Sequence, residues 1–512
     1  MSLPPPALIP DDVAHLRADL TSLGSIAEEL GAVATAALDR EQRVPALLAA
    51  RASGSREAII ARLFLLGDRV PTDLVDLALP TLGSDGATRL GLIRPAGADL
   101  VRATVDLRPV GTDDTRLWFA SDIGERVTGR ALSANHVLGV GGASLTLVGI
   151  TDRRRVNRAL DLGTGCGIQA SLLWGHAETV TATDLSERAL AFARFNAALN
   201  GQEWEVRQGS LFEPVAGERF DLIVSNPPFV ITPRAAYEAG LPVMEYRDAG
   251  DGEITGDHLL TQILGQLRAH LTSGGRAHML ANWEHRRGED WVERLATAAS
   301  GLDLWVIERE AMDPAQYVEL WLRDGGFRTG ERDRSEAVYA AWLEDFQSRG
   351  VESIGFGYIL AAPTPAERGP ARRFEIAEGP ASQPVGEHLA IAFDAQRRHA
   401  DEAAAHPDTE PLAHVSHWRV ATPPGTTVEH HFLPGSDDPS VMLLRQGGGL
   451  GRTHRLDTAL AGLVSVADGE LTVGQTAAAL SELLDVPTDA LTAEVSSAVV
   501  ELVATGLLER VD

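Results

Sequence analysis

Residues 159–169 have the sequence ALDLGTGCGIQ, in which a short apolar strand leads directly into a glycine-rich turn. Asp161 lies at the end of the strand, and glycine stands at every second position of the turn that follows. Glycine tolerates positive φ and lets backbone amides approach a ligand closely. The helix expected after the turn adds a positive partial charge at its N-terminus. A dinucleotide-binding turn would need glycine where Ile168 stands, so the stretch predicts a ligand-binding turn of another kind.

Strand and helix patterns alternate on both sides of this turn. Strands are expected over 158–162, 179–184, 204–208, 220–225, 276–282, 304–310 and 353–361, and helices over 168–175, 187–200 and 256–271. This alternation predicts an α/β fold in which a parallel, Rossmann-like sheet carries helices on both faces. Asp184 ends the second strand, where a carboxylate can accept hydrogen bonds from the two ribose hydroxyls of a nucleoside.

A second signal is the stretch FDLIVSNPPFVI (220–231), in which a strand runs into two prolines. Prolines hold φ at about −65° and lack an N–H, so the carbonyl groups of this turn point outward instead of joining a ladder. The side-chain oxygen of Asn226 and the carbonyl of Pro227 can then accept hydrogen bonds from one planar NH2 group. The ring of Phe229 can stack on the same group. An ordinary Pro-Pro turn is the alternative interpretation.

Both signals resemble motifs of one enzyme class. The spacing Asp-x-Gly-x-Gly-x-Gly from Asp161 resembles motif I of class I S-adenosylmethionine-dependent methyltransferases, and Asn-Pro-Pro-aromatic resembles the motif of the amino-group methyltransferases. Residues 209–229 are most similar to HemK-type protein glutamine methyltransferases, although Ser210 stands where those enzymes usually carry an acidic residue. Phe229 also resembles the aromatic residue of ribosomal RNA guanine-N2 methyltransferases. The resemblance covers residues 135–310 and implies a class I methyltransferase fold with S-adenosyl-L-methionine as cofactor.

The resemblance also implies roles for individual residues. It assigns catalysis to the Asn-Pro-Pro-Phe turn, which consists of Asn226, Pro227, Pro228 and Phe229. It places the cofactor against the glycine turn, the end of the second strand and the adjoining loops, at Asp161, Gly163, Thr164, Gly165, Gly167, Asp184, Leu185, Ser210, Leu211, Asn226 and Gly141. Gly141 belongs to the loop HVLGVGGAS (136–144), which we expect over the methionine end of the cofactor, with a plain turn as the alternative.

The expected reaction is methylation of an amide or aryl amino nitrogen, which is a poor nucleophile because its lone pair is delocalised. The two acceptors of the proline turn can hold the hydrogens of this nitrogen and stabilise the positive charge that develops on it.

Three classes of function stay open. The HemK-like run favours a protein glutamine methyltransferase. The second class is an RNA or DNA methyltransferase that acts on guanine-N2 or adenine-N6. The third is a cofactor-binding regulator without catalytic activity. A methyltransferase with a small-molecule amine as acceptor also stays open.

The amino-acid composition excludes some enzyme mechanisms and disfavours nucleic-acid binding. The 512 residues include 72 acidic and 45 basic side chains, the formal net charge is −27, and every basic residue is arginine. The lack of lysine excludes Schiff-base and Walker-type mechanisms. The acidity disfavours non-specific binding of nucleic acid, although residues 1–120 hold 12 arginines against 16 acidic residues and can still form a local basic face. We therefore expect a macromolecular acceptor, most readily a protein.

The chain lacks the features of a secreted or membrane protein. Its start, MSLPPPALIPDD, has no basic segment followed by an apolar run, as a signal peptide would. No uncharged apolar stretch reaches about 18 residues. The single cysteine, Cys166, excludes an internal disulfide framework and fits a reducing compartment. These features predict a cytoplasmic protein that does not insert into a membrane.

Composition shifts predict four segments along the chain. They are a helical, winged-helix-like N-terminal domain (1–98), a catalytic domain (99–361), a linker rich in Pro, Ala and Gly (362–385), and a C-terminal domain (386–512) that ends in a second winged-helix-like unit.

Three smaller features are further candidates for a functional role. Cys166 is expected to pack in the glycine turn rather than act as a nucleophile. Six histidines between 399 and 431 match no zinc spacing, so no metal is predicted. Tyr246 and Arg247 are candidate substrate contacts in a lid over 245–258.

Overall fold

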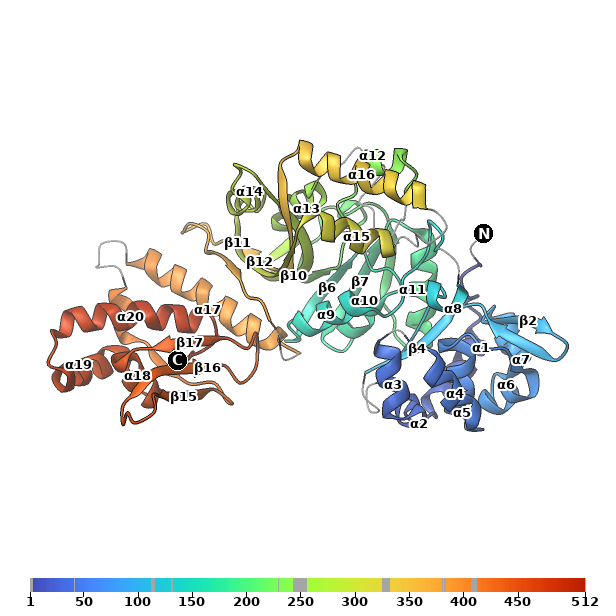
Figure 1. Cartoon of the computed structure of the whole chain (residues 1–512), viewed down its shortest axis with the longest axis horizontal. Helices are drawn as coiled ribbons and strands as arrows, with labels where there is room; N and C mark the ends of the chain where they lie inside the picture. Colours follow the sequence, from blue (N-terminus) through green and yellow to red (C-terminus); the bar gives the residue numbers. More distant parts are fainter. Residues whose placement is uncertain are drawn as a thin grey trace.

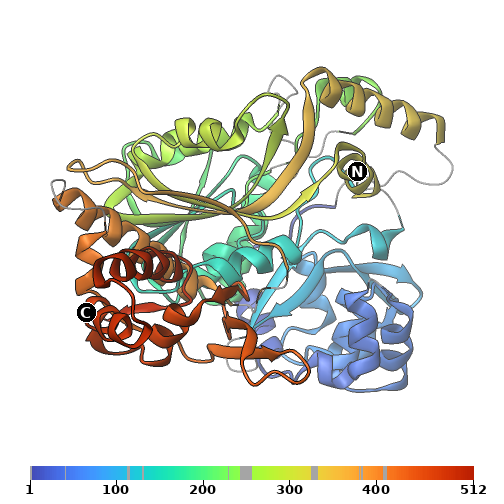
Figure 2. The same cartoon turned by 60° about the vertical axis from the view of Figure 1, so that its left-hand side comes forward.

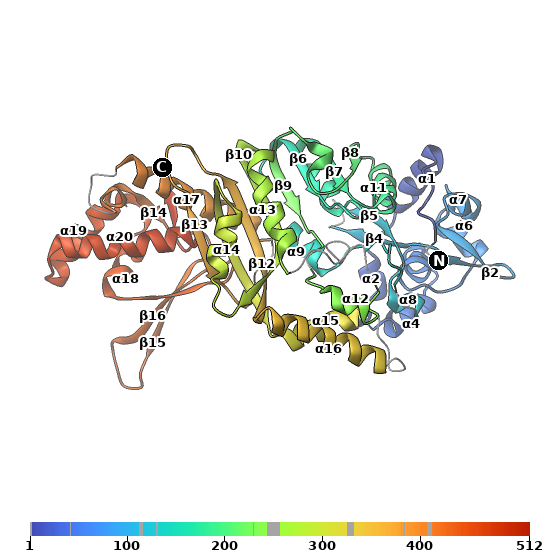
Figure 3. The same ribbon diagram turned by 90° about the horizontal axis from the view of Figure 1, so that it is seen from above.

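The computed structural model describes residues 3–40, 42–111, 116–129, 132–228, 230–242, 256–324, 332–379, 381, 384–406 and 412–511, with only the backbone described at 126, 324 and 332. The chain forms three units in a row: a helical N-terminal unit, a central α/β domain and a C-terminal unit (Figure 1). Seen from above, the two terminal units lie at opposite ends of the molecule (Figure 3).

The central domain is built on one eight-stranded sheet of order β13-β11-β12-β10-β9-β6-β7-β8. Its strands are β6 (Val156–Leu162), β7 (Ala177–Asp184), β8 (Glu205–Gln208), β9 (Phe220–Ser225), β10 (Leu271–Arg286), β11 (Leu302–Met312), β12 (Val351–Pro363) and β13 (Arg372–Ile376). Only β12 runs antiparallel to its neighbours. The chain runs outward from β6 to β8 and then returns to β9 on the other side of β6. Ligands bind at such a reversal of strand order in doubly wound sheets.

Helices cover both faces of this sheet, as expected for the predicted α/β fold. In β9, Leu222 and Val224 pack against one helical layer, whereas Ile223 packs against the other. The first layer contains α9 (Gly142–Ile150), α10 (Ile168–Leu173), α11 (Glu187–Leu199) and α17 (Gly386–Ala405), and the second contains α13 (His258–His270) and α14 (Trp291–Ala298). The alternation of strands and helices in the sequence thus predicted the layers correctly.

The segment expected as a linker, 362–385, contributes a strand to the sheet. β13 pairs in parallel with β11 and becomes the edge of the central sheet. Its Phe374 packs edge-on against Trp291, with ring centroids 5.6 Å apart. Arg373, also in β13, forms an ion pair with Glu501 of the C-terminal unit at 2.6 Å. The prolines and glycines that suggested a linker flank this strand instead of filling it.

The N-terminal unit consists of helices and two small sheets. Its helices are α1 (Pro10–Thr21), α2 (Ile26–Leu30), α3 (Ala32–Asp39), α4 (Val44–Ala52), α5 (Arg56–Ile60), which continues into a π-helical turn (Ala61–Leu65), α6 (Thr72–Ala78), α7 (Gly83–Arg89) and α8 (Glu125–Thr128). Its strands are β1 (Val70–Pro71), β2 (Ile93–Gly97), β3 (Leu100–Ala103), β4 (Asp106–Val110) and β5 (Leu117–Ser121). They form the sheet β1-β3-β2 and the pair β4-β5.

The expected boundary between residues 98 and 99 falls inside the β2–β3 hairpin. One hydrophobic core continues past it, from Val13 to Val137, and also includes Phe192 and Phe195 of α11. The side chain of Asn196, in α11, accepts a hydrogen bond from the Ala120 N–H at 2.8 Å and donates one to the Ala120 carbonyl at 2.9 Å. Residues 99–137 therefore belong to the N-terminal core, which is anchored on the central domain through α11.

The C-terminal unit follows α17. Its strands are β14 (Arg419–Ala421), β15 (Thr427–Phe432), β16 (Pro439–Arg445), β17 (Thr453–Leu456), β18 (Asp468–Thr472) and β19 (Glu509–Val511), and its helices are α18 (Thr458–Ser465), α19 (Val473–Leu484) and α20 (Thr488–Ala504). The three helices lie around the small sheet β18-β14-β19. α17 connects this unit to the central domain, where Asp303 of β11 accepts hydrogen bonds from Arg368 at 2.7 Å and from Arg397 at 2.9 Å.

Three further helices pack beyond the carboxyl ends of β10 and β11. They are α12 (Arg234–Glu238), α15 (Pro314–Asp324) and α16 (Arg332–Ser348). Their buried side chains form a separate cluster with Val230 and Ile231, which follow the proline turn. In Figure 2, α16 extends at the top of the molecule beyond the end of the long strand β12. None of the described helices combines the length and apolarity needed to cross a bilayer.

Candidate active site

A cavity of about 1950 Å³ lies at the carboxyl ends of β6, β7 and β9, where the strand order reverses. Its wall includes the glycine turn after β6, the loop before α9 and the turns after β7, β8 and β9. The N-terminal unit contributes Leu38, Arg43 and Leu65 to the wall. A site for one small ligand usually measures about 300–1,000 Å³, so this cavity has room for two ligands side by side.

The glycine turn leaves an open stretch of cavity wall. Gly163 and Gly165 have φ angles of 77° and 57°, and a Cβ atom on either would meet no atom within 4 Å. Their N–H groups do not face a ligand, contrary to the expectation from the sequence. The Gly163 N–H donates to the Thr183 carbonyl and the Gly165 N–H donates to the Asp184 carboxylate, both at 2.9 Å. The glycines therefore provide space and a shaped surface rather than hydrogen-bond donors.

Two residues expected at the cofactor support the turn without lining the cavity. Asp161 is 1% exposed, and its Oδ2 accepts hydrogen bonds from the Thr164 hydroxyl at 2.6 Å and from the Ala170 N–H at 2.9 Å. Burial raises the pKa of the Asp161 carboxyl to about 7, against the effect of these two hydrogen bonds. Gly167 has a φ of 89°, and a Cβ atom there would lie 2.5 Å from the Trp204 ring. Asp161 thus positions the turn, and Gly167 allows close packing beneath it.

Asp184 lies at the end of β7, in the wall of the cavity, as expected. Its Oδ1 accepts a hydrogen bond from the Ser186 N–H at 2.9 Å, and its Oδ2 accepts the one from Gly165. These two bonds fix the orientation of the carboxylate in the wall of the cavity. The structure therefore connects Asp184 directly to the glycine turn, which the sequence spacing alone did not show.

Three of the other residues expected at the cofactor also line the cavity. Leu185 is 71% exposed and presents an apolar surface at the rim. Ser210 and Leu211 lie in the turn after β8. Leu211 has a φ of 47°, an uncommon value for a residue with a branched side chain. Such strain is found at ligand-binding turns, and here it accompanies a wall of apolar and hydroxyl groups suited to a planar ring.

The proline turn places Asn226 at the cavity, next to the glycine turn. The Ser225 hydroxyl donates to the Leu162 carbonyl at 2.8 Å and so joins the ends of β9 and β6. Asn226 and Pro228 line the cavity, whereas the Pro227 side chain is buried and does not. The side-chain oxygen of Asn226 is buried and has no hydrogen-bond partner among the described residues. Leaving such an acceptor unpaired costs about 1–3 kcal/mol, so a ligand that donates a hydrogen bond to this oxygen would recover that free energy.

The loop before α9 forms another part of the wall. All nine residues of 136–144 line the cavity, including Gly139, Gly141 and Gly142. A Cβ atom at Gly139 would lie 2.3 Å from the Ser121 hydroxyl, so this glycine allows the loop to approach β5 closely. Gly141 is the residue before α9, and a Cβ atom there would meet nothing within 4 Å. The structure thus places Gly141 at the cavity, as expected.

Sequence reasoning missed an ion pair in the same wall. Arg188 of α11 forms a bidentate ion pair with Asp122, the residue after β5, with an Nη2–Oδ1 distance of 2.5 Å. Asp122 Oδ2 also accepts a hydrogen bond from the Val137 N–H at 2.9 Å. The pair therefore holds together α11, the end of β5 and the loop before α9. Its two members are 66 positions apart in the chain and belong to no motif, so only the fold could reveal it.

The remaining candidates differ in their outcome. Phe229, Tyr246 and Arg247 lie outside the described residues. Cys166 is buried in the glycine turn, and burial raises the pKa of its thiol to about 12. The thiol is therefore protonated at neutral pH, which argues against a nucleophilic role. Among the described residues, no group of three or more His, Cys, Asp and Glu side chains is arranged to hold a metal ion.

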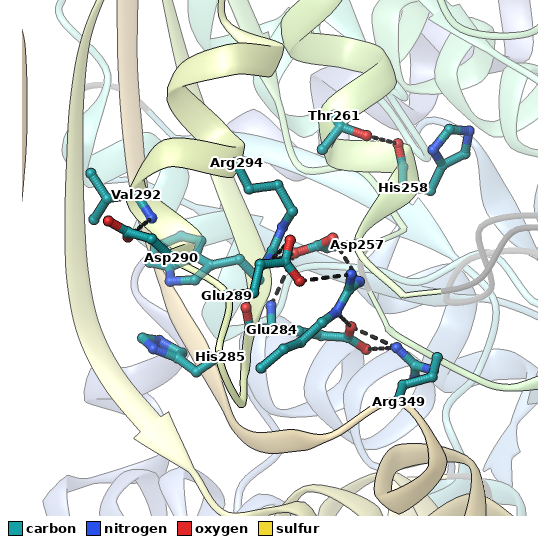
Figure 4. A network of polar contacts seen from close by, with 12 residues as sticks. Asp257, His258, Thr261, Glu284, His285, Glu289, Asp290, Val292, Arg294 and Arg349 are labelled. Carbon is teal, nitrogen blue, oxygen red and sulfur yellow. Dashed lines mark hydrogen bonds and ion pairs between the residues drawn. The ribbon is translucent and has the colours of Figure 1, made fainter.

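A network of buried charges supports the wall on the side of α13 (Figure 4). Glu284 of β10 is 0% exposed and accepts hydrogen bonds from Arg349 at 2.5 Å and from Arg286 at 2.7 Å. Asp257, the residue before α13, accepts from the Glu284 N–H at 3.0 Å and from Arg294 at 2.7 Å. Leu259 and Gln262 of α13 line the cavity. The network thus fixes the start of a helix that forms part of the site.

Family models match two parts of the chain. Residues 22–104 match a domain of unknown function (DUF7059). Residues 139–244 match the methyltransferase small domain. This second match covers the glycine turn, Asp184 and the proline turn. Together with the order of the strands, it confirms the Rossmann-like methyltransferase fold class that the sequence predicted.

Individual methyltransferases are similar over the same region. A release factor glutamine methyltransferase of Bordetella pertussis is 40% identical over 162 residues, which are 30% of this chain and 60% of that protein. A ribosomal RNA small subunit methyltransferase C of Salmonella newport is 35% identical over 144 residues, 28% of this chain and 35% of that protein. The chain thus spans less than two thirds of the length of these relatives. A solved 16S rRNA N2 methyltransferase of T. thermophilus, in complex with AdoMet and guanosine, is 15% identical over 49% of this chain and 66% of its own, with a TM-score of 0.27.

Proposed function

We propose that the chain is an S-adenosylmethionine-dependent methyltransferase that transfers a methyl group to a planar amide or amino nitrogen. The observation that carries this proposal is the buried, unpartnered side-chain oxygen of Asn226 at the cavity. It lies in a turn that is joined to the glycine turn through Ser225 and Leu162. An amide side chain in the wall of a cavity, next to a proposed nucleoside site, can supply the acceptor that methylation of an NH2 group requires.

The residues of the cavity fit the proposed cofactor. Asp184 offers carboxylate oxygens for the ribose hydroxyls, and Leu185, Ser210 and Leu211 offer a flat, largely apolar surface for the adenine ring. The open surface at Gly163 and Gly165 leaves room for the rest of the molecule. S-adenosylmethionine, when bound, supplies a methyl group on a positively charged sulfur.

The side chain of Asn226 acts on the acceptor. Its oxygen accepts a hydrogen bond from the NH2 group and so fixes the direction of the nitrogen lone pair, which is otherwise delocalised. The same oxygen stabilises the positive charge that develops on the nitrogen. The turn that carries Asn226 is joined to the end of β6, next to the glycine turn. The acceptor nitrogen is thereby held in a fixed orientation relative to the cofactor, and this orientation contributes to the rate.

We propose a protein glutamine as the acceptor. The described residues of the cavity wall carry balanced charges, with four arginines and five carboxylates, at Arg43, Arg108, Arg188, Arg323, Asp106, Asp122, Glu125, Asp184 and Glu187. Proteins that bind single-stranded nucleic acid combine a basic groove with aromatic side chains that stack on bases. The balanced charge of the described wall suits a polypeptide segment better than a polyanion.

The alternative acceptor is a base of RNA or DNA. The similarity to a ribosomal RNA methyltransferase favours it, and so do the two terminal units, each of which combines helices with a small sheet. In that case the base would have to leave its stack to reach Asn226. Binding to such an acceptor would weaken steeply with salt, because contacts to phosphates release counterions.

Transfer of a labelled methyl group distinguishes these acceptors. The full chain is incubated with methyl-labelled S-adenosylmethionine and fractionated cell lysate, and the products are treated with nuclease or protease. We expect label that survives nuclease and is lost with protease. Label that survives protease and is lost with nuclease would establish the nucleic-acid alternative. Label in no macromolecular fraction would contradict both.

The substitution Asp184→Asn tests the cofactor site. It keeps the size of the side chain but removes the charge that ribose hydroxyls would meet. Hydrogen bonds to charged groups contribute about 1.5–3 kcal/mol each, so we expect the affinity for S-adenosylmethionine to fall by about 10- to 100-fold. Calorimetric titration measures this affinity. The control is Asp489→Asn, at an exposed position of α20 in the C-terminal unit, which should bind like the wild type. Equal affinities in both variants would remove Asp184 from the site.

A further inference from the structure

The backbone that follows the proline turn is held by two aromatic side chains from α15 and α16. The Ile231 N–H donates to the Tyr317 hydroxyl oxygen at 2.8 Å. The Ile231 carbonyl accepts a hydrogen bond from the Trp342 indole N–H at 3.1 Å. Both polar groups of this one residue are therefore bound by side chains that lie 86 and 111 positions further along the chain.

These two aromatic residues are fixed in position. Tyr317 and Trp342 are both 0% exposed. The Tyr317 ring packs against the rings of Trp342, Phe346 and Phe356, with centroid separations of 6.4, 5.8 and 5.7 Å. Edge-on aromatic contacts at these separations are favourable. The packed cluster fixes the Tyr317 hydroxyl and the Trp342 indole N–H in place. The two hydrogen bonds therefore determine the position of the Ile231 backbone.

The same helix also reaches the cavity. Leu320 and Arg323 of α15 line it together with Pro228 of the proline turn. They follow Tyr317 by three and six positions, which is about one and two turns of an α-helix. α15 therefore contacts the cavity at one end and holds the chain behind the proline turn at the other. It lies outside the region that matches the methyltransferase small domain, 139–244.

We infer that Tyr317 and Trp342 are positioning residues for methyl transfer, which hold the proline turn so that the Asn226 oxygen meets the acceptor nitrogen. The inference rests on the proposed function. Asn226 is bound to the sheet on its N-terminal side through Ser225. Tyr317 and Trp342 provide the second anchor, five residues later along the chain. A displacement of about 1 Å at a reacting group can lower a rate by about 100-fold.

The substitution Tyr317→Phe removes one hydroxyl and keeps the ring in its cluster. We expect kcat for methyl transfer to fall by about 10- to 100-fold. The affinity for S-adenosylmethionine should stay at the wild-type value, since Tyr317 is not among the residues that line the cavity. The concentration of cofactor-binding sites is measured by calorimetric titration, and kcat is calculated per site. A variant that contains some unfolded protein therefore does not show a falsely low kcat. Trp342→Phe, which removes the other hydrogen bond, should act in the same direction.

Tyr339→Phe is the matched control. Tyr339 is a half-buried residue of α16, and its hydroxyl donates a hydrogen bond to Glu319 at 3.2 Å. The same chemical change there should leave kcat at the wild-type value. Hydrogen exchange gives a second readout, because the peptide that contains residues 230–242 should exchange faster in Tyr317→Phe and not in Tyr339→Phe.

The outcomes separate the inference from the proposed function. A lower kcat at unchanged cofactor affinity in Tyr317→Phe, but not in Tyr339→Phe, supports the positioning role. A wild-type kcat in Tyr317→Phe, or a loss of cofactor affinity in parallel with kcat, would overturn it while the methyltransferase activity stands. A wild-type protein that transfers no methyl group to any acceptor would overturn the proposed function and this inference with it.

Discussion

Replacing Asn226 with alanine is expected to lower kcat for methyl transfer by about 10²- to 10³-fold, the loss seen when one preorganised polar group is removed from an active site. The Asn226 oxygen is one of two buried side-chain oxygens, in residues that line the cavity, without a partner among the described residues; the other is the Thr183 hydroxyl. Its removal takes away both the hydrogen bond that orients the NH2 group and the charge stabilisation. The affinity for S-adenosylmethionine should change by no more than a few-fold.

The measurement is a single-turnover rate with cofactor in excess, together with a calorimetric titration. Asn157→Ala is the control, because Asn157 is exposed near the start of β6, at the opposite end of that strand from the cavity. It should behave like the wild type in both assays. If Asn226→Ala transferred methyl groups at close to the wild-type rate, the assignment of the proline turn as the catalytic element would be wrong.

The second large effect concerns stability. Glu284→Gln is expected to lower the free energy of unfolding of the central domain by about 2 kcal/mol, because charge-assisted hydrogen bonds are lost at a buried position, while Arg349 and Arg286 keep other carboxylate partners. Glu284 is fully buried and its carboxylate bonds to Arg349 and Arg286. The substitution keeps the size of the side chain, so the loss reports on charge rather than on a cavity. Urea unfolding followed by tryptophan fluorescence measures it.

Glu352→Gln is the matched control for this experiment. Glu352 of β12 forms an ion pair with Arg287 at 2.9 Å, and their side chains are 55% and 80% exposed. Exposed pairs contribute about 0–1 kcal/mol, so this substitution should hardly move the transition. Equal midpoints for the two variants would show that the network in Figure 4 does not stabilise the domain.

Local patterns in the sequence predicted the fold of the central domain well. The strand that carries Asp161, the glycine turn and Asp184 all lie where the pattern placed them, because a βαβ unit is a local structure whose turn is encoded in consecutive residues. Asn226 was located for the same reason. The linker expected at 362–385 was wrong because flanking prolines and glycines concealed a five-residue strand, β13.

Features that depend on distant pairs could not be found in this way. Asp122 and Arg188, or Tyr317 and Ile231, come together only when separate elements pack, and neither pair belongs to a motif. The role of Asp161 was also misjudged. Its place at the strand end suggested a ligand contact, whereas the hydrogen bonds at its Oδ2 come from the Thr164 hydroxyl of the turn and the Ala170 N–H of α10.

The most direct test of the account is a calorimetric titration of the wild-type chain with S-adenosylmethionine. We expect one molecule to bind per chain, at the glycine turn and Asp184, and we expect Asp184→Asn to weaken this binding while Asn226→Ala does not. The absence of binding at millimolar cofactor, in a chain shown to be folded, would contradict the account. The assignments of Asp184, of Asn226 and of the positioning residues Tyr317 and Trp342 would then fall together.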